Sequence, residues 1–210
     1  MEEVLPGVVH WTAVHPVINI AVSSYWLDDG GIALDPLLPP QEGIDWFGGR
    51  ATKPAAVVLT NRLHYRHSAQ LVEAFGVDVF VPRRGLHQFS DRPPVTAYDP
   101  GDTLPGGLVV HEVGAICADE MALHHASGRF LAMADGVVRV GPDQPLGFVP
   151  DSLMDDPAGT KRALLAVYKR FLAELDFDHL LLAHGGAIVD DGRTQLAEFV
   201  NSGGRTAFEF

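Results

Sequence analysis

The stretch Val58–Leu71, "VLTNRLHYRHSAQL", decides the fold, because it reads as a buried strand, a loop with two histidines and the start of a helix. The apolar run 55–60 is typical of a strand inside a parallel sheet. The segment 68–76 carries apolar residues at helical spacing and stops at a glycine, which commonly caps a helix. The stretch therefore predicts a strand–loop–helix unit with His64 and His67 at a sheet edge.

The regions on either side supply further strands and helices in a consistent order. A cluster of aspartate and glycine at 28–31 predicts a hairpin turn between two opening strands. Strands are predicted at 7–14, 17–27, 30–35, 77–82, 107–113, 120–126, 129–135 and 178–183, and helices at 44–47, 160–175 and 193–200. Because strands pair early in each half and helices follow them, we expect an α/β fold with two sheets packed face to face, a four-layer αββα sandwich.

Composition limits the function classes. The 210 residues, of which 47% are hydrophobic, predict one globular domain spanning 1–210. The net charge of -12 argues against nucleic-acid binding, since the molecule as a whole repels phosphate. No signal peptide or membrane span is recognisable, so we expect a cytoplasmic protein. Cys117 is the single cysteine, which excludes a disulfide framework and a cysteine-rich zinc site.

Polar residues follow three of the predicted strands: the pair His64 and His67, then Asp135, then His184. In layered α/β folds, sites collect at loops beyond the carboxyl ends of strands. Imidazole nitrogen and carboxylate oxygen are ligands for zinc or iron, and such an ion can activate a bound water. These residues therefore predict a site for one divalent metal.

Each of these residues also has a purely structural interpretation. The two histidines could cap or pack against the helix start, and Asp135 before Gly136 could form an ordinary turn. Glu120 is either a carboxylate supporting the site or a surface residue. Cys117 lies near the predicted site, but with no base fixed beside it, a buried inert thiol is the favoured interpretation.

The order of several segments resembles that of the metallo-β-lactamase-fold hydrolases, over about Val17 to Gly186. These segments are "GGIALDPLL", "VVLTNRLHYRHSAQL", "HEVGAICADEMALHH", "FLAMADG" and "LLLAHGG". The resemblance implies an αββα sandwich with a one- or two-metal site at its edge and hydrolysis of thioesters, lactams, phosphodiesters or other bonds. Some members of the family are redox proteins.

The resemblance also assigns the predicted ligands. His64 and His67 correspond to two histidines of the family's first motif, Asp135 to its bridging aspartate and His184 to its final histidine. Asp35 corresponds to an aspartate that closes the opening strands near the site.

Other ligand positions of the family are replaced. Arg62 falls at the first histidine, although Asn61 could instead occupy that place, and Arg66 falls at the aspartate. Ala115 stands where a further histidine is expected. Because a guanidinium group cannot ligate a metal, the arginines argue against a two-metal centre.

Two functions remain open from the sequence. In the first, one zinc or iron ion serves hydrolysis of a small ester, thioester or phosphoester, with Asp135 orienting the water and Arg66 or Glu120 contacting substrate. In the second, the protein is an inactive, metal-free relic in which Arg62 and Arg66 clamp an anion. The expected partner is a small-molecule substrate or anion, and a homodimer is left open.

Overall fold

The computed structural model describes residues 1–207, which form a seven-stranded and a six-stranded sheet. The first sheet follows chain order across its width, with antiparallel pairs as far as β4 and parallel pairs from β4 to β7. Its strands are β1 (Glu2–Leu5), β2 (Val8–Val14), β3 (Ala21–Leu27), β4 (Ile32–Leu34), β5 (Ala56–Val58), β6 (Asp78–Pro82) and β7 (Thr96–Tyr98).

The second sheet has the order β13-β12-β11-β10-β9-β8. Its pairs are antiparallel except for β11 with β12, which are parallel. Its strands are β8 (Thr103–Leu104), β9 (Leu108–Glu112), β10 (Met121–His125), β11 (Phe130–Met133), β12 (His179–Leu182) and β13 (Gly186–Ile188).

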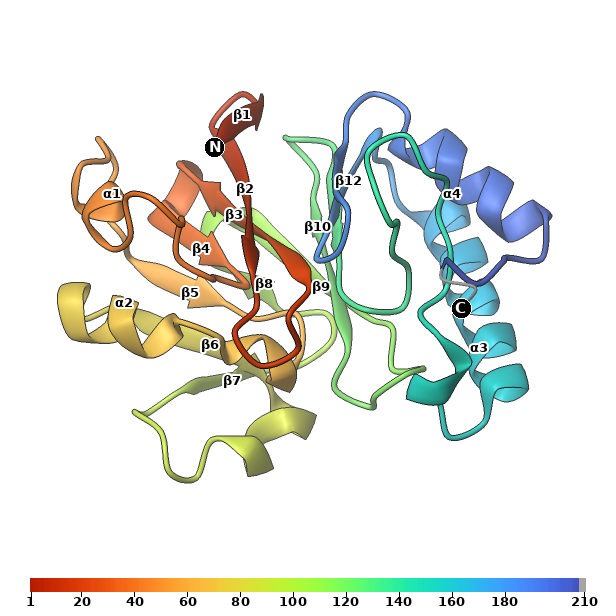
Figure 1. Cartoon of the computed structure of the whole chain (residues 1–210), viewed down its shortest axis with the longest axis horizontal. Coiled ribbons are helices and arrows are strands. Elements are labelled where there is room, and N and C mark those ends of the chain that lie inside the picture. The colour runs from red at the N-terminus through yellow and green to blue at the C-terminus, as the bar shows by residue number, and fades with distance from the viewer. Residues whose placement is uncertain (208–210) are drawn as a thin grey trace.

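Helices cover the outer face of each sheet, which gives the four layers seen in Figure 1. On the first sheet lie α1 (Asp45–Gly48) and α2 (Ser68–Phe75), and on the second lie α3 (Pro157–Glu174) and α4 (Gly192–Asn201). The predicted αββα sandwich is therefore confirmed. No helix within residues 1–207 is long and apolar enough to cross a membrane.

Three apolar clusters hold the layers together. The central cluster joins the two sheets, with Tyr25, Leu34 and Val58 on one side and Met121 and Leu123 on the other. The outer clusters join α1 and α2 to the first sheet, and α3 and α4 to the second. Burial of these side chains is the main favourable contribution to the fold, about 1.5–3 kcal/mol for each large side chain.

The helix predictions hold in their physical detail. Gly76 ends α2 in the left-handed conformation, with φ 67°, and its N–H donates to Val72 O. Along α3, Leu164, Tyr168 and Phe171 are fully buried, as their spacing predicts. These features are local, which is why the sequence pattern was sufficient to predict them.

One strand is shorter than predicted. Instead of beginning at Val17, β3 begins at Ala21, and the residues before it form a turn in which His15 N–H donates to Ile20 O at 2.8 Å. Val17 and Ile18 are 83% and 53% exposed. The apolar residues among 17–20 therefore lie in an exposed loop and are not part of the strand.

The register of the strands brings distant residues to one edge. β11 and β12 pair in parallel with Met133 opposite Leu182, so Asp135 and His184 lie at the same offset beyond their strands. On the other sheet, β4 and β5 pair in parallel with Leu34 opposite Val58, which places Asp35 beside Thr60. The predicted strand-end residues therefore share one edge of the sandwich.

Backbone hydrogen bonds join the two sheets at this edge. Ser23 N–H donates to Ala183 O at 2.8 Å, and Met121 N–H donates to Thr60 O at 2.9 Å. The Tyr25 hydroxyl donates to Leu182 O at 2.8 Å. These contacts fix the distance between the loop after β5 and the loops after β11 and β12.

Candidate metal centre

His64 lies in a short 3₁₀ helix, η2 (Arg62–Tyr65), directly after β5. Asn61 caps this helix, because its Oδ1 accepts the N–H of Leu63 at 2.9 Å. The other end of the same amide donates from Nδ2 to Asp135 Oδ2 at 2.8 Å. Asn61 is fully buried, so it couples the position of the histidine loop to that of Asp135.

Asp35 orients the imidazole of His64. Its Oδ2 lies 2.9 Å from His64 Nδ1, and its carboxylate also accepts the Thr60 N–H at 2.8 Å and the Thr60 hydroxyl at 2.5 Å. A carboxylate bonded to Nδ1 leaves Nε2 free and turned toward the site, which is the usual support for a metal-binding histidine. Asp35 has a φ of 47°, a conformation that aspartate tolerates better than most residues.

Three predicted residues converge at the edge of the sheets. Asp135 Oδ1 lies 3.2 Å from His64 Nε2 and 3.1 Å from His184 Nε2. One ligand atom from each residue lies within 4.8 Å of those of the other two. The side chains of Asp135 and His184 are 20% and 16% exposed, so the group opens toward solvent on one side.

The charges in this group are strongly coupled. Burial would lower the pKa of His64, but the carboxylates of Asp35 and Asp135 outweigh it and raise that pKa to about 9. Burial would likewise raise the pKa of Asp135, yet His64 and His184 hold it well below its usual range. Asp135 is therefore an ionised carboxylate, the form that binds a cation.

The three residues fit a divalent metal ion. Within residues 1–207, Asp135 Oδ1 is buried and makes no hydrogen bond of good geometry, although it faces the Nε2 atoms of His64 and His184 at 3.2 and 3.1 Å, so an ion held between these three atoms would satisfy it. Two imidazoles and one carboxylate are the donor set of catalytic zinc sites and of non-haem iron(II) sites that leave coordination positions open. The donor chemistry does not distinguish between these two metals.

His67, the fourth predicted ligand, is not among the three residues that converge here. Its Nδ1 accepts the backbone N–H of Leu38 at 3.1 Å, and the residue stands at the N-cap position of α2, where its side chain makes no capping hydrogen bond. The imidazole is therefore used in joining the helix start to the loop after β4.

The two arginines have separate roles. Arg62 forms a salt bridge with the buried Asp119, which also accepts the Arg62 N–H at 2.7 Å. Arg66 Nη1 donates to the backbone oxygens of Ser23 and Asp35 at 2.8 and 2.7 Å. Arg62 is paired with Asp119 and is not among the described lining residues of the pocket that Arg66 lines. An anion clamp formed by both arginines is therefore not supported by this geometry.

Glu120 is not among the described lining residues of the pocket, and it lies where the sequence allowed a carboxylate that supports the site. It is 1% exposed, and its Oε1 accepts the N–H of Gly136 at 2.7 Å. Burial and the nearby Asp135 raise its pKa to about 8. Glu120 is thus a support beneath the Asp135 loop.

Cys117 is half-buried, and burial together with the acidic groups around it raises its pKa far above the usual range for a thiol. A thiol in this environment stays protonated and is a poor nucleophile. The prediction of an inert cysteine agrees with this environment.

A pocket of about 560 Å³ opens over the three converging residues. His64, Asp135, His184 and Arg66 lie at its base, and most of its remaining lining is apolar. Its size is within the usual range for small-molecule sites. Most of this lining was missed by sequence reasoning, because residues such as Ile116, in a loop, and Leu153, in a short 3₁₀ helix, lie in segments without a hydrophobic periodicity.

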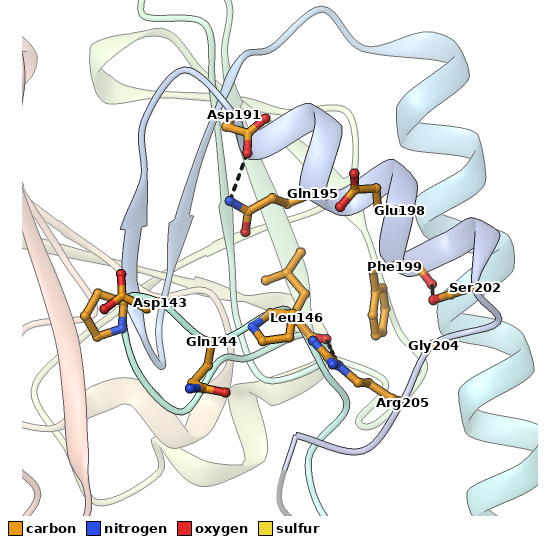
Figure 2. A pocket seen from close by; sticks show the side chains of 12 residues that line it. Asp143, Gln144, Leu146, Asp191, Gln195, Glu198, Phe199, Ser202, Gly204 and Arg205 are labelled. Atoms are coloured by element: carbon orange, nitrogen blue, oxygen red, sulfur yellow. Dashed lines mark hydrogen bonds between the residues drawn. The ribbon is translucent and has the colours of Figure 1, made fainter.

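A larger hollow of about 760 Å³ lies elsewhere, between the 142–146 loop and α4 (Figure 2). It contains no histidine or cysteine among its described lining residues, and some of its polar side chains bond to one another or to the backbone. Gln195 donates to Asp191 at 3.0 Å, and Arg205 Nε donates to Leu146 O at 3.2 Å. It offers no comparable set of metal ligands.

The comparisons with known proteins bear on the fold. No protein-family model and no curated protein matches the sequence. Among solved structures, the protein TTHA1623 in a di-iron-bound form aligns with a TM-score of 0.65 and 21% identity, over 85% of this chain and 94% of its own.

Two further solved structures align over nearly the whole chain. The metallo-β-lactamase family protein TTHA1429 from Thermus thermophilus aligns with a TM-score of 0.68 and 16% identity, over 95% of this chain and 80% of its own. TMB-1, whose structure concerns substrate and inhibitor binding, aligns with a TM-score of 0.70 and 12% identity, over 96% of each chain. Together with the two sheets and their outer helices, these alignments show that the chain has the metallo-β-lactamase fold.

Proposed function

We propose that the protein hydrolyses a small ester or thioester with one divalent metal ion, zinc or iron, held by His64, Asp135 and His184. One observation carries this proposal. Two imidazole Nε2 atoms and a buried carboxylate oxygen lie within 4.8 Å of one another at the base of a small-molecule pocket. Similarity to a di-iron protein and to metallo-β-lactamases supports metal chemistry at this edge of the fold.

A metal bound there would supply Lewis-acid chemistry, polarising a carbonyl oxygen and making a water more acidic. In the reaction, the water oxygen bonds to the carbonyl carbon, the bond to the alcohol oxygen or thiol sulfur breaks, and the water's proton passes to the leaving group. The residues of this chain hold the reactants. Asp135 is fixed by Asn61 and orients the water, while Asp35 keeps His64 turned inward.

Arg66 supplies a fixed positive charge at the base of the pocket. Its guanidinium is anchored on one nitrogen by the oxygens of Ser23 and Asp35, and the residue lines the pocket beside Asp135. A cation in this place stabilises negative charge that develops on the carbonyl oxygen during attack. A phosphoester is less well served, because Arg66 is the single arginine or lysine among the described lining residues.

Metal analysis of protein purified without a chelating tag tests the proposal. We expect about one equivalent of zinc or iron, and loss of that metal from His184→Ala, whose side chain makes no other structural bond within the described residues. A drop of at least about 100-fold in kcat/KM on p-nitrophenyl acetate should accompany this loss, since the metal contribution is several kcal/mol. His87→Ala is the matched control, because His87 is exposed and is not among the described lining residues of the pocket.

Less than about a tenth of an equivalent of metal, with unchanged activity in His184→Ala, would refute the proposal. That result would favour the metal-free alternative, in which Arg66 alone binds an anion. Direct titration with acetate and with inorganic phosphate would then measure anion binding, and Arg66→Met would remove it.

A further inference from the structure

The pocket over the metal centre is divided into a polar base and apolar walls. The base is defined as the polar lining residues His64, Arg66, Asp135 and His184, and His15 is a further polar lining residue. The other described lining residues are apolar: Ile18, Ile20, Val22, Leu63, Ile116, Val138, Val149, Pro150 and Leu153. An apolar wall this extensive over a polar base is typical of a site for an amphiphilic small molecule.

The walls come from separate parts of the chain. Val22, Val138 and Val149 are buried and form the inner wall, at 1%, 1% and 8% exposure. Ile18 and Leu153 form part of the rim and remain more than half exposed, at 53% and 64%. Leaving such side chains in water is unfavourable, and a ligand that covers them recovers part of that free energy.

The charges of the lining restrict what can lie along the walls. Apart from the histidines, the described lining contains one basic residue, Arg66, and one acidic residue, Asp135. Both belong to the base. A ligand group that carries charge and lies against the walls would lose its hydration without finding a partner, which is costly. By contrast, the hollow in Figure 2 has charged residues such as Asp143 and Glu198 along its sides.

We infer that the substrate is an ester or thioester of an uncharged, hydrocarbon-chain acyl group, whose chain lies along the apolar walls while its carbonyl reaches the base. The placement of the carbonyl at the base rests on the proposed hydrolysis. The apolar walls bind the hydrocarbon chain of the ligand whether or not its ester or thioester bond is cleaved. Ile18 and Leu153 are the specificity-determining residues at the rim. Affinity rises with chain length, by about fourfold for each added CH₂ that becomes buried.

Binding of N-methylalkanamides to the full chain by calorimetry tests the inference without turnover. These probes are uncharged amide analogues of the substrate, and acyl chains of four, six and eight carbons are compared. We expect affinity to rise by about 15-fold for each step of two carbons that is fully buried. An ammonium group at the end of the eight-carbon chain should abolish that gain.

Rim variants with a matched control assign the effect to the pocket. Ile18→Ser and Leu153→Ser should each weaken binding of the eight-carbon amide by about 3- to 10-fold, as expected for partial loss of apolar contact. Val14→Ser should leave it unchanged, because Val14 is 61% exposed on the strand leading into the same hairpin but does not line the pocket. Affinities that are independent of chain length, or equal in the three variants, would overturn the inference.

Rates on p-nitrophenyl acetate and p-nitrophenyl octanoate separate this inference from the proposed function. Tight binding of the eight-carbon amide without cleavage of either ester would refute hydrolysis and leave the pocket assignment in place. Equal cleavage of both esters, with amide binding that does not vary with chain length, would refute the pocket assignment and leave hydrolysis in place.

Discussion

Replacing Asp35 by alanine should be among the most damaging single changes near the site. Its carboxylate accepts hydrogen bonds from Thr60 N–H and the Thr60 hydroxyl and contacts His64 Nδ1, and all of these groups are buried. An unsatisfied buried donor costs about 1–3 kcal/mol. The φ of 47° adds about 1 kcal/mol for alanine.

The sum for Asp35→Ala is about 2–4 kcal/mol, since the Thr60 hydroxyl and His64 Nδ1, 3.0 Å apart, can pair with each other and leave only the Thr60 N–H unsatisfied. This is a large part of the 5–15 kcal/mol by which domains are usually stable. Asp35→Asn tolerates the same φ and can still accept the Thr60 N–H, so we expect a loss of about 1–3 kcal/mol. Equilibrium urea unfolding measures both losses, with the exposed Asp91→Ala as control.

Metal affinity gives a second measurement on the same variants. Loss of the carboxylate that orients a ligating histidine typically lowers metal affinity by about 10- to 100-fold, and we expect this for Asp35→Asn while it is still folded. The reasoning is refuted if Asp35→Ala lowers the free energy of unfolding by less than about 1 kcal/mol and Asp35→Asn leaves metal affinity unchanged. The hydrogen bonds of Asp35 would then not be what holds His64 in place.

Three further changes probe the supports of the site. Glu120→Gln should stabilise the protein above pH 8. Burial raises the folded pKa of Glu120 from 4.5 to about 8, so its contribution to wild-type stability falls by several kcal/mol between those pH values. Urea unfolding should therefore show that the variant gains stability relative to wild type between pH 5 and pH 8, and a constant difference would contradict the shift. Gly136→Ala should cost about 1–3 kcal/mol by thermal unfolding, because a Cβ would overlap the Tyr168 hydroxyl and Glu120 Oε1 would lie only 3.0 Å away; an unchanged Tm would contradict the packing described. Asp119→Ala should cost about 2–3 kcal/mol by leaving the partly buried Arg62 unpaired, whereas Asp119→Asn, which still accepts the Arg62 N–H, should cost less in the same unfolding assay.

Local patterns in the sequence were sufficient for the fold class. The apolar run before His64, the helical spacing in 160–175 and the glycine that ends α2 each report on neighbouring residues, and the structure confirms them. Short or exposed pieces were predicted less well. Four short strands, β1, β7, β8 and β13, were not predicted, and the apolar residues 17–20 were predicted to be part of a strand although they form an exposed turn.

The sequence also located the residues that converge at the candidate metal centre. His64, Asp135 and His184 each follow a strand, and strands that end at one edge bring such residues together. It could not tell which histidine turns inward. His64 does so because Asp35 holds its Nδ1, whereas His67 bonds to Leu38, and both partners are 29 positions away in the chain.

The sequence by itself determined the αββα layers and the types of ligand available, because periodicity and strand ends are local properties. The tertiary structure alone decided which polar groups became partners. Arg62 finds Asp119 across 57 positions, and Glu120 is buried beneath the loop after β11, where the sequence allowed a surface residue. The physical reason is that a charged group must be paired or hydrated, and only packing of the two sheets and their loops determines which of these a given side chain obtains.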